Sequence, residues 1–205
     1  MLFTLPILSE IPTLIKRSLF SCIGLLLASS NAVFASEVSI TSFGHSALLI
    51  EGGGKSVLTN PFKSVGCTSG LNEIRLNVDV ILASSQLADE GYKTSKGTYL
   101  VKPGSYRVKG LRFEGFASPH DRLGGRRFGN ATLWQWEQGG MKFAHLGGAA
   151  APLSAEDKLL LGSPDVLIIA VGGGAKVYSG MEAARVVADL KPRKVIPVQY
   201  LRENF

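Results

Sequence analysis

The chain has 205 residues, 45% of them hydrophobic and 19% charged, and a formal net charge of +6. This length and apolar content suit one folded domain with a real core, and they exclude a disordered chain, a coiled coil and a collagen-like repeat. The two Cys and three His exclude a disulfide scaffold and a Cys-rich zinc site, and they limit a His-based metal site to three imidazole ligands.

The N-terminal segment has the pattern of an export signal. Lys16 and Arg17 precede an apolar run within residues 18–35 that ends in small residues. Val33 and Ala35 suit the −3 and −1 positions of a signal peptidase site. The apolar run is shorter than the roughly 20 residues that a membrane-spanning helix needs, although an uncleaved anchor is the alternative.

Cleavage after this segment gives a signal peptide over residues 1–35 and a mature domain over residues 36–205. We therefore expect the protein in a periplasm, a thylakoid-type lumen or the extracellular space. Cys67 is then the lone cysteine of the mature chain, and we expect it to be a partly buried small residue.

The first part of the mature chain is rich in strand patterns. Strands are predicted at 38–42, 46–51 and 56–59, and a continuously apolar, buried strand at 79–83. The segments that follow predict a three-stranded meander with a Pro-Gly turn, over residues 99–102, 106–109 and 112–117.

The second part alternates strands with helices. A hairpin is predicted at 132–137 and 142–146, followed by a helix at 155–161 and a second buried strand at 165–171. Ser179 and Glu182 form a capping box for a helix that ends near Leu190, and the last strand is predicted at 194–198. Between them, Gly172-Gly173-Gly174-Ala175-Lys176 lacks the spacing of a phosphate loop, so a tight turn is expected.

Several segments carry a family resemblance through their order and spacing. They lie at residues 40–51, 57–62, 125–132, 145–148, 152–154, 166–173 and 191–200. Together they resemble the metallo-β-lactamase superfamily, and most closely its ascorbate-phosphate lactonase-like branch of Zn-dependent hydrolases. The resemblance implies an α/β fold, an αββα four-layer sandwich, with a metal site built at one edge from loops at strand ends.

The resemblance places the main metal-binding loop, Thr-His-x-His-x-Asp-His in the family, directly after the strand at 79–83. Here Ser85 and Leu87 stand at the first two His positions, Asp89 keeps the Asp, and Glu90 replaces the last His.

The remaining ligand positions lie further along the chain. His120 fits the next ligand, Gly148 stands where the bridging Asp belongs, and Gln199 stands where the final His belongs. Asn60 also replaces an Asp that the family usually has before Pro61. His45 and His145 match positions that are not ligands, and we expect them to be structural.

Leucine and glycine side chains donate no electron pair to a metal, and Ser and Gln are weak ligands. We therefore expect no cofactor and a degenerate zinc site in a non-hydrolytic binding or assembly protein. The alternative is a metal-dependent hydrolase of an ester, lactone or phosphoester, with Zn or Mn held by Asp89, Glu90 and His120. Asp89 and His120 are then the candidate catalytic residues.

Two further arrangements stay open for these residues. Asp89 could instead cap a turn or pair with Arg126 or Arg127. Ser84 or Ser85 could form a serine hydrolase dyad with His120 and Asp121, although no Gly-x-Ser-x-Gly motif is present. The candidate ligand-binding residues of the ancestral cleft are Ser85, Arg126, Arg127, Asn130 and Gln199.

Residues 93–127 are strongly basic, with nine Lys or Arg against Glu114 and Asp121. If they cluster in space, they could bind an anionic ligand, a membrane surface or an acidic protein partner. Strand alternation would instead scatter them over solvated faces. Nucleic acid is not expected, because the aromatic residues of this segment occupy plausible core positions.

Overall fold

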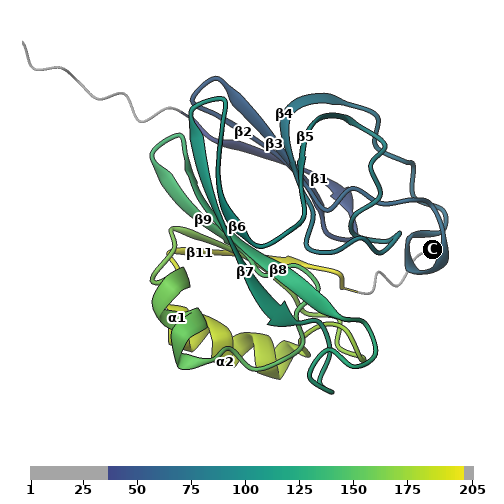
Figure 1. Cartoon of the computed structure of the whole chain (residues 1–205), viewed down its shortest axis with the longest axis vertical. Coiled ribbons are helices and arrows are strands. Elements are labelled where there is room, and N and C mark those ends of the chain that lie inside the picture. Colours follow the sequence, from purple (N-terminus) through teal and green to yellow (C-terminus); the bar gives the residue numbers. More distant parts are fainter. Residues whose placement is uncertain (1–36, 201–205) are drawn as a thin grey trace, which may run out of the picture. The chain divides into compact units, whose positions relative to one another are not determined.

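The computed structural model describes residues 37–200, so the expected signal peptide over residues 1–35 lies outside the described part. Two mixed sheets form the fold (Figure 1). The first sheet has the order β1-β2-β3-β4-β5, in which β1, β2 and β3 are antiparallel and β3, β4 and β5 are parallel. Its strands are β1 (Ser39–Gly44), β2 (Ala47–Gly52), β3 (Lys55–Thr59), β4 (Asn77–Leu82) and β5 (Lys96–Leu100).

The second sheet has the order β11-β10-β9-β8-β7-β6. The strands from β6 to β9 are antiparallel, whereas β9, β10 and β11 are parallel. The strands are β6 (Gly104–Val108), β7 (Leu111–Pro119), β8 (Asn130–Gln138), β9 (Met141–His145), β10 (Val166–Ala170) and β11 (Lys194–Val198).

The predicted meander over residues 99–117 is wrong. β5 pairs with β4 in the first sheet, whereas β6 pairs with β7 in the second, so the chain changes sheets between Leu100 and Gly104. Pro103 lies in this crossing, where its missing N–H leaves no ladder hydrogen bond unmade. Local apolar spacing predicts a strand but does not identify the sheet that the strand joins.

The main core lies between the two sheets. Trp134, Trp136, Phe113 and Phe143 of the second sheet are at most 2% exposed, and they belong to one cluster with apolar side chains of the first sheet. The Trp134 indole N–H also donates to the Ala83 carbonyl at 2.9 Å. This bond ties the end of β4 to the second sheet.

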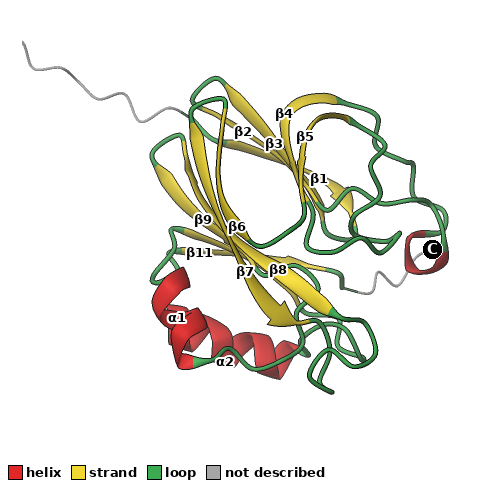
Figure 2. Ribbon diagram, viewed as in Figure 1, coloured by secondary structure: helices red, strands yellow, loops and turns green. Residues whose placement is uncertain are grey.

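The two α-helices of residues 37–200, α1 (Ala155–Leu161) and α2 (Gly180–Leu190), pack against the outer face of the second sheet (Figure 2). The predicted capping box of Ser179 and Glu182 is confirmed, and Ser154 forms a second one with Asp157 at the start of α1. No helix among residues 37–200 is long and apolar enough to cross a membrane.

The outer face of the first sheet is covered differently. Its apolar side chains pack against loop residues that include Phe62 and Ile74. The short 3-10 helix η1 (Gly66–Thr68) lies in the same stretch of chain and leaves Cys67 exposed, so the expectation that Cys67 is partly buried is wrong. Two mixed sheets with packed helices confirm the predicted α/β sandwich class.

Candidate functional site

Loops at the ends of several strands bring Asn60, Ser84 and three of the family's ligand positions together at one edge of the sandwich. Each residue follows the carboxyl end of a strand. Strands that run in the same direction end at the same edge of a sheet, so these residues meet there. Asn60 follows β3, Ser84 follows β4, His120 follows β7, Gly148 lies shortly after β9, and Gln199 follows β11.

Asn60 joins the first two of these loops. Its side-chain oxygen accepts from the Ser84 backbone N–H at 2.8 Å, and its amide group donates to the Ser84 hydroxyl at 2.9 Å. The same amide nitrogen lies 3.3 Å from the Ser46 hydroxyl. Asn60 is fully buried. Its amide both donates and accepts hydrogen bonds, whereas an ionised carboxylate at this position could only accept them.

Glu90 is the buried carboxylate at the centre of the site, and it is 1% exposed. It accepts hydrogen bonds from the hydroxyls of Ser84 at 3.2 Å and Ser85 at 2.9 Å. It also contacts Nε2 of the fully buried His120. Two hydroxyls and one imidazole ring thus contact this carboxylate.

Two opposing effects set the pKa of Glu90. Burial alone would raise the pKa, because it disfavours the charged form. The hydrogen bond and charge of the His120 ring, the charge of Lys176 and the Ser85 hydroxyl outweigh burial and hold the pKa below its ordinary value. Glu90 therefore remains an ionised acceptor at neutral pH.

Gly148 lies against the Glu90–His120 pair. A Cβ at Gly148 would lie 2.4 Å from Glu90 Oε2 and 2.6 Å from His120 Cε1. The volume that a bridging aspartate would need at this position is thus filled by the pair. Only glycine fits here unless the pair moves.

This donor set does not fit a zinc ion as it stands. Glu90 and His120 are bonded to each other, and Leu87 and Gly148 contribute no ligand atom. Within residues 37–200, no group of three His, Cys, Asp or Glu side chains is placed to hold one ion.

Gln199, which follows β11 of the second sheet, contacts the loop that contains His45 and Ser46. Its amide nitrogen lies 3.2 Å from the Ser46 hydroxyl and 3.1 Å from His45 Nε2. Burial lowers the pKa of His45, an effect that the nearby carboxylates of Asp89 and Glu90 oppose. A neutral His45 ring can accept a hydrogen bond from the Gln199 amide.

The backbone is strained at three residues of the loops that form the site. His45, Asn60 and Gln199 have φ values of +50°, +40° and +54°, in the left-handed region that non-glycine residues rarely adopt. The Gln199 N–H donates to the His45 carbonyl at 2.9 Å, and the Asn60 N–H donates to the Leu82 carbonyl at 2.8 Å. The tertiary contacts of the site thus hold these loops in place.

Asp89 does not join Glu90 and His120. Its carboxylate pairs with the ammonium group of Lys176 at 2.5 Å, and both side chains are largely buried. The alternative pairing with Arg126 or Arg127 is therefore wrong. Sequence reasoning missed Lys176, although its place after a glycine-rich turn at the expected edge of the site was a usable signal.

His145 is a buried structural histidine beside the site. Its Nδ1 accepts from the Gly147 N–H at 3.1 Å, and burial lowers its pKa to about 4. The ring is therefore neutral at physiological pH.

A cavity of about 450 Å³ opens beside the network, and its volume lies in the range of small-molecule sites. Of the candidate ligand-binding residues, Ser85 and Asn130 line it, together with Lys102 and Phe128. Gln199 instead lies in the hydrogen-bond network, away from this cavity.

Arg126 and Arg127 are exposed on the loop that follows His120. Asp121 organises this loop, because its carboxylate accepts from the backbone N–H groups of Leu123, Gly125, Arg127 and Phe128. Asp121 therefore does not orient His120, and the serine dyad is not assembled: Ser85 donates to Glu90, not to the His120 ring.

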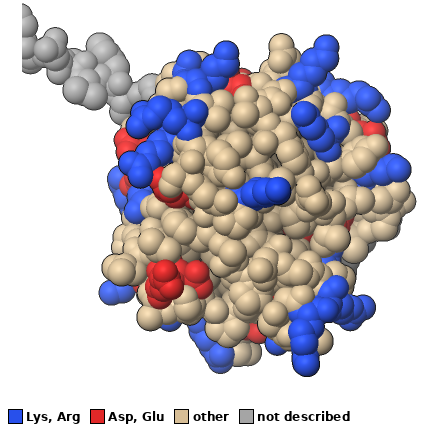
Figure 3. Space-filling view, in the orientation of Figure 1, with Lys and Arg blue, Asp and Glu red and all other residues tan. Residues whose placement is uncertain are grey.

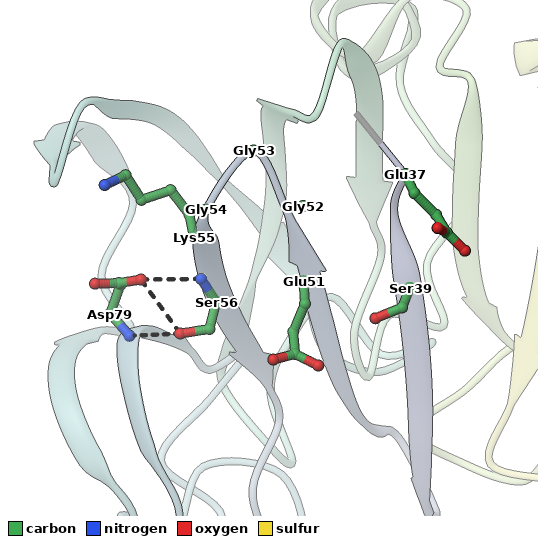
Figure 4. A pocket seen from close by; sticks show the side chains of 9 residues that line it. All are labelled: Glu37, Ser39, Glu51, Gly52, Gly53, Gly54, Lys55, Ser56 and Asp79. Atoms are coloured by element: carbon green, nitrogen blue, oxygen red, sulfur yellow. Dashed lines mark hydrogen bonds between the residues drawn. The ribbon is translucent and has the colours of Figure 1, made fainter. Parts of the chain in front are cut away.

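A wider cavity lies at the other end of β3, around the β2–β3 turn. It contains Glu37, Glu51 and Asp79, which come from separate segments, and Asp79 is bonded to Ser56 at 2.9 Å (Figure 4). The three carboxylates do not converge on one point. This cavity lies at the opposite end of β3 from Asn60, and neither Glu90 nor His120 lines it.

The basic residues of segment 93–127 are spread over both sheets, from the loop before β5 to the loop after β7. On the face shown in Figure 3, Lys and Arg form several separate groups. Arg112 pairs with Glu114, and Arg122 pairs with Glu182.

The two sheets, the helices on one outer face and the strand-end loops define a sandwich of the metallo-β-lactamase class. The family described as "Beta-lactamase superfamily domain" matches residues 39–199, and the chain belongs to this family. No curated protein gives a significant match.

Solved structures agree with this assignment. A Thermotoga maritima protein assigned to the Zn-dependent hydrolases of the metallo-β-lactamase superfamily is 26% identical, with a TM-score of 0.66, over 82% of this chain and 79% of that one. A metallo hydrolase from Ignicoccus hospitalis, 19% identical over 80% of this chain and 83% of its own, shares the fold with a TM-score of 0.57.

Proposed function

We propose that this chain is a metal-independent binding or assembly protein built on a hydrolase fold. The observation that carries the proposal is that the Glu90 carboxylate is hydrogen-bonded to the side chains of Ser84, Ser85 and His120. Glu90 and His120, which stand at ligand positions of the family, thus contact each other. Without a metal, no bound water has its pKa lowered toward neutrality, so the hydrolytic nucleophile of metal-dependent enzymes is not formed.

The cavity beside Ser85 is the proposed ligand site. Lys102 and Asn130 offer a positive charge and an amide at its wall, and Phe128 offers an apolar surface. These groups suit a small polar or anionic ligand with an apolar part. Export, which only the N-terminal pattern supports, would place this site in a periplasm, a lumen or the extracellular space.

Metal analysis of the protein purified without chelator tests the main proposal. We expect Zn and Mn well below one equivalent, and no change of the melting temperature on adding EDTA, because a bound metal would be linked to folding. One equivalent of metal that is lost in His120→Ala would overturn the proposal.

The ligand site has its own test. Native mass spectrometry of the freshly purified protein should detect a co-purifying small molecule that is lost in Asn130→Ala. The matched control is Asn77→Ala, since Asn77 is exposed on β4 and lies outside the cavity. Equal retention in both variants would contradict this location.

A metal-dependent hydrolase is the second candidate, because the structure brings Glu90 and His120 into contact and the similar structures include metal-dependent hydrolases. It would require Asp89 to leave Lys176 and turn toward the pair. Hydrolysis of nitrophenyl esters, lactones or phosphoesters that depends on added Mn or Zn and is lost in His120→Ala would favour this candidate.

A further inference from the structure

The positively charged side chain of Lys176 lies beside the carboxylates of the site. The Lys176 ammonium group is 2.5 Å from the Asp89 carboxylate, and the side chains of the pair are 25% and 15% exposed. The ammonium group also lies 5.7 Å from the centroid of the Phe128 ring. Its charge acts on two other groups of the site, since it lowers the pKa values of both Glu90 and His45.

The turn that carries Lys176 is held on both sides of this residue. The Arg122 guanidinium donates to the Gly174 carbonyl and, at 3.0 Å, to the Val177 carbonyl. Arg122 is itself paired with Glu182 in the first turn of α2. Gly172 lies so close to Gln199 that a Cβ would be 2.0 Å from the Gln199 carbonyl oxygen. The turn is therefore fastened next to the site.

We propose that the Lys176 ammonium group is the resident cation of this site, which balances the Asp89 and Glu90 carboxylates and thereby closes the site to divalent ions. The inference rests on the proposed metal-independent function. Adjacent carboxylates that are shielded from water require positive charge nearby. A tethered ammonium group supplies it at high effective concentration.

The exposed pair Lys158–Asp189 provides the comparison, because its side chains are 42% and 45% exposed. Such a surface pair contributes little, since water screens both charges. Loss of the Lys176 charge should therefore lower the melting temperature much more than loss of the Lys158 charge.

The test measures melting temperatures of the full chain in EDTA and with Mn²⁺ or Zn²⁺ alone. We expect Lys176→Met to melt below Lys158→Met in EDTA and to be restabilised by the divalent ion in a saturable way. Wild type and Lys176→Arg, which keep the positive charge, should not respond to the metal. The double variant Asp89→Asn/Lys176→Met should recover stability in EDTA and lose the metal response.

The proposal is overturned if Lys176→Met is as stable as Lys158→Met, or if divalent ions leave its melting temperature unchanged. Should Lys176→Met not fold, the double variant decides: a folded double variant supports charge balance, and an unfolded one contradicts it. A wild type that already holds one equivalent of metal would contradict the proposed function and this inference with it, whereas unresponsive Lys176 variants beside a metal-free wild type would contradict the inference alone.

Discussion

At the scale of single residues, the site is defined by how its buried polar groups find partners. Asn60 donates and accepts where an acid could only accept, and Glu90 is surrounded by two hydroxyls and a histidine. His120 Nδ1 and Gln199 Oε1, in contrast, are buried without a hydrogen-bond partner among residues 37–200, so the network is satisfied only in part. Gly148 is part of it, because its missing side chain provides the space for the Glu90–His120 pair.

Gly148→Ala is therefore expected to destabilise the fold by about 1–3 kcal/mol, as overpacking of a dense interior does. Denaturant unfolding measures the change. Gly180→Ala is the control, because a Cβ at Gly180 meets nothing within 4 Å. Equal unfolding free energies for the two variants would show that the pair tolerates a methyl group.

His145 predicts a pH dependence of stability. Its pKa is lowered from 6.5 to about 4 in the folded protein, so the unfolded chain binds the proton more readily in this interval. Its contribution is fully present above pH 6.5 and is lost as the pH falls toward 4, by about 3 kcal/mol in total.

His145→Asn keeps an acceptor for Gly147 but removes the titrating ring. Unfolding free energies between pH 7 and pH 4 should therefore fall less steeply in this variant. An unchanged slope would mean that other groups cause the acid sensitivity.

At the scale of elements, the helices and the turns before them are determined by local chemistry. The capping box of α2 joins the Ser179 hydroxyl to the Glu182 N–H at 3.3 Å, and the Glu182 carboxylate to the Ser179 N–H at 2.7 Å. Glu182 also holds Arg122, which fastens the turn that carries Lys176. The start of α2 and the candidate site are thus linked.

Ser179→Ala should destabilise the protein by about 1 kcal/mol, as loss of an N-cap does. Chemical denaturation measures it, with Met181→Ala as the control because Met181 is 70% exposed in the same turn. A Ser179 variant as stable as the Met181 variant would contradict a stabilising cap.

At the scale of the whole domain, the two sheets share one core. Trp134 and Trp136 pack in the cluster that includes Leu48 and Val80 of the first sheet. Neither sheet can bury its inner face alone, so residues 37–200 should unfold as one unit.

Tryptophan fluorescence and far-UV circular dichroism should consequently give the same denaturation midpoint. The fluorescence reports the inter-sheet core, whereas the dichroism reports all secondary structure. Separate midpoints would indicate that one sheet survives the loss of the other.

The sequence by itself determined the features that depend on neighbouring residues and on ordered motifs. The helix over Ala155–Leu161 and the last strand over Lys194–Val198 agree with prediction, because caps and apolar runs act locally. The family resemblance indicated the sandwich and the positions at which metal ligands are replaced. These features need no knowledge of distant contacts.

Only the tertiary structure decided which strands share a sheet and which side chains meet. The crossing after β5 and the pairing of Asp89 with Lys176 join segments whose partners lie far away in the chain. Local patterns carry no information on such contacts, because hydrophobic burial is non-directional and a charge pairs with whichever opposite charge the fold brings near.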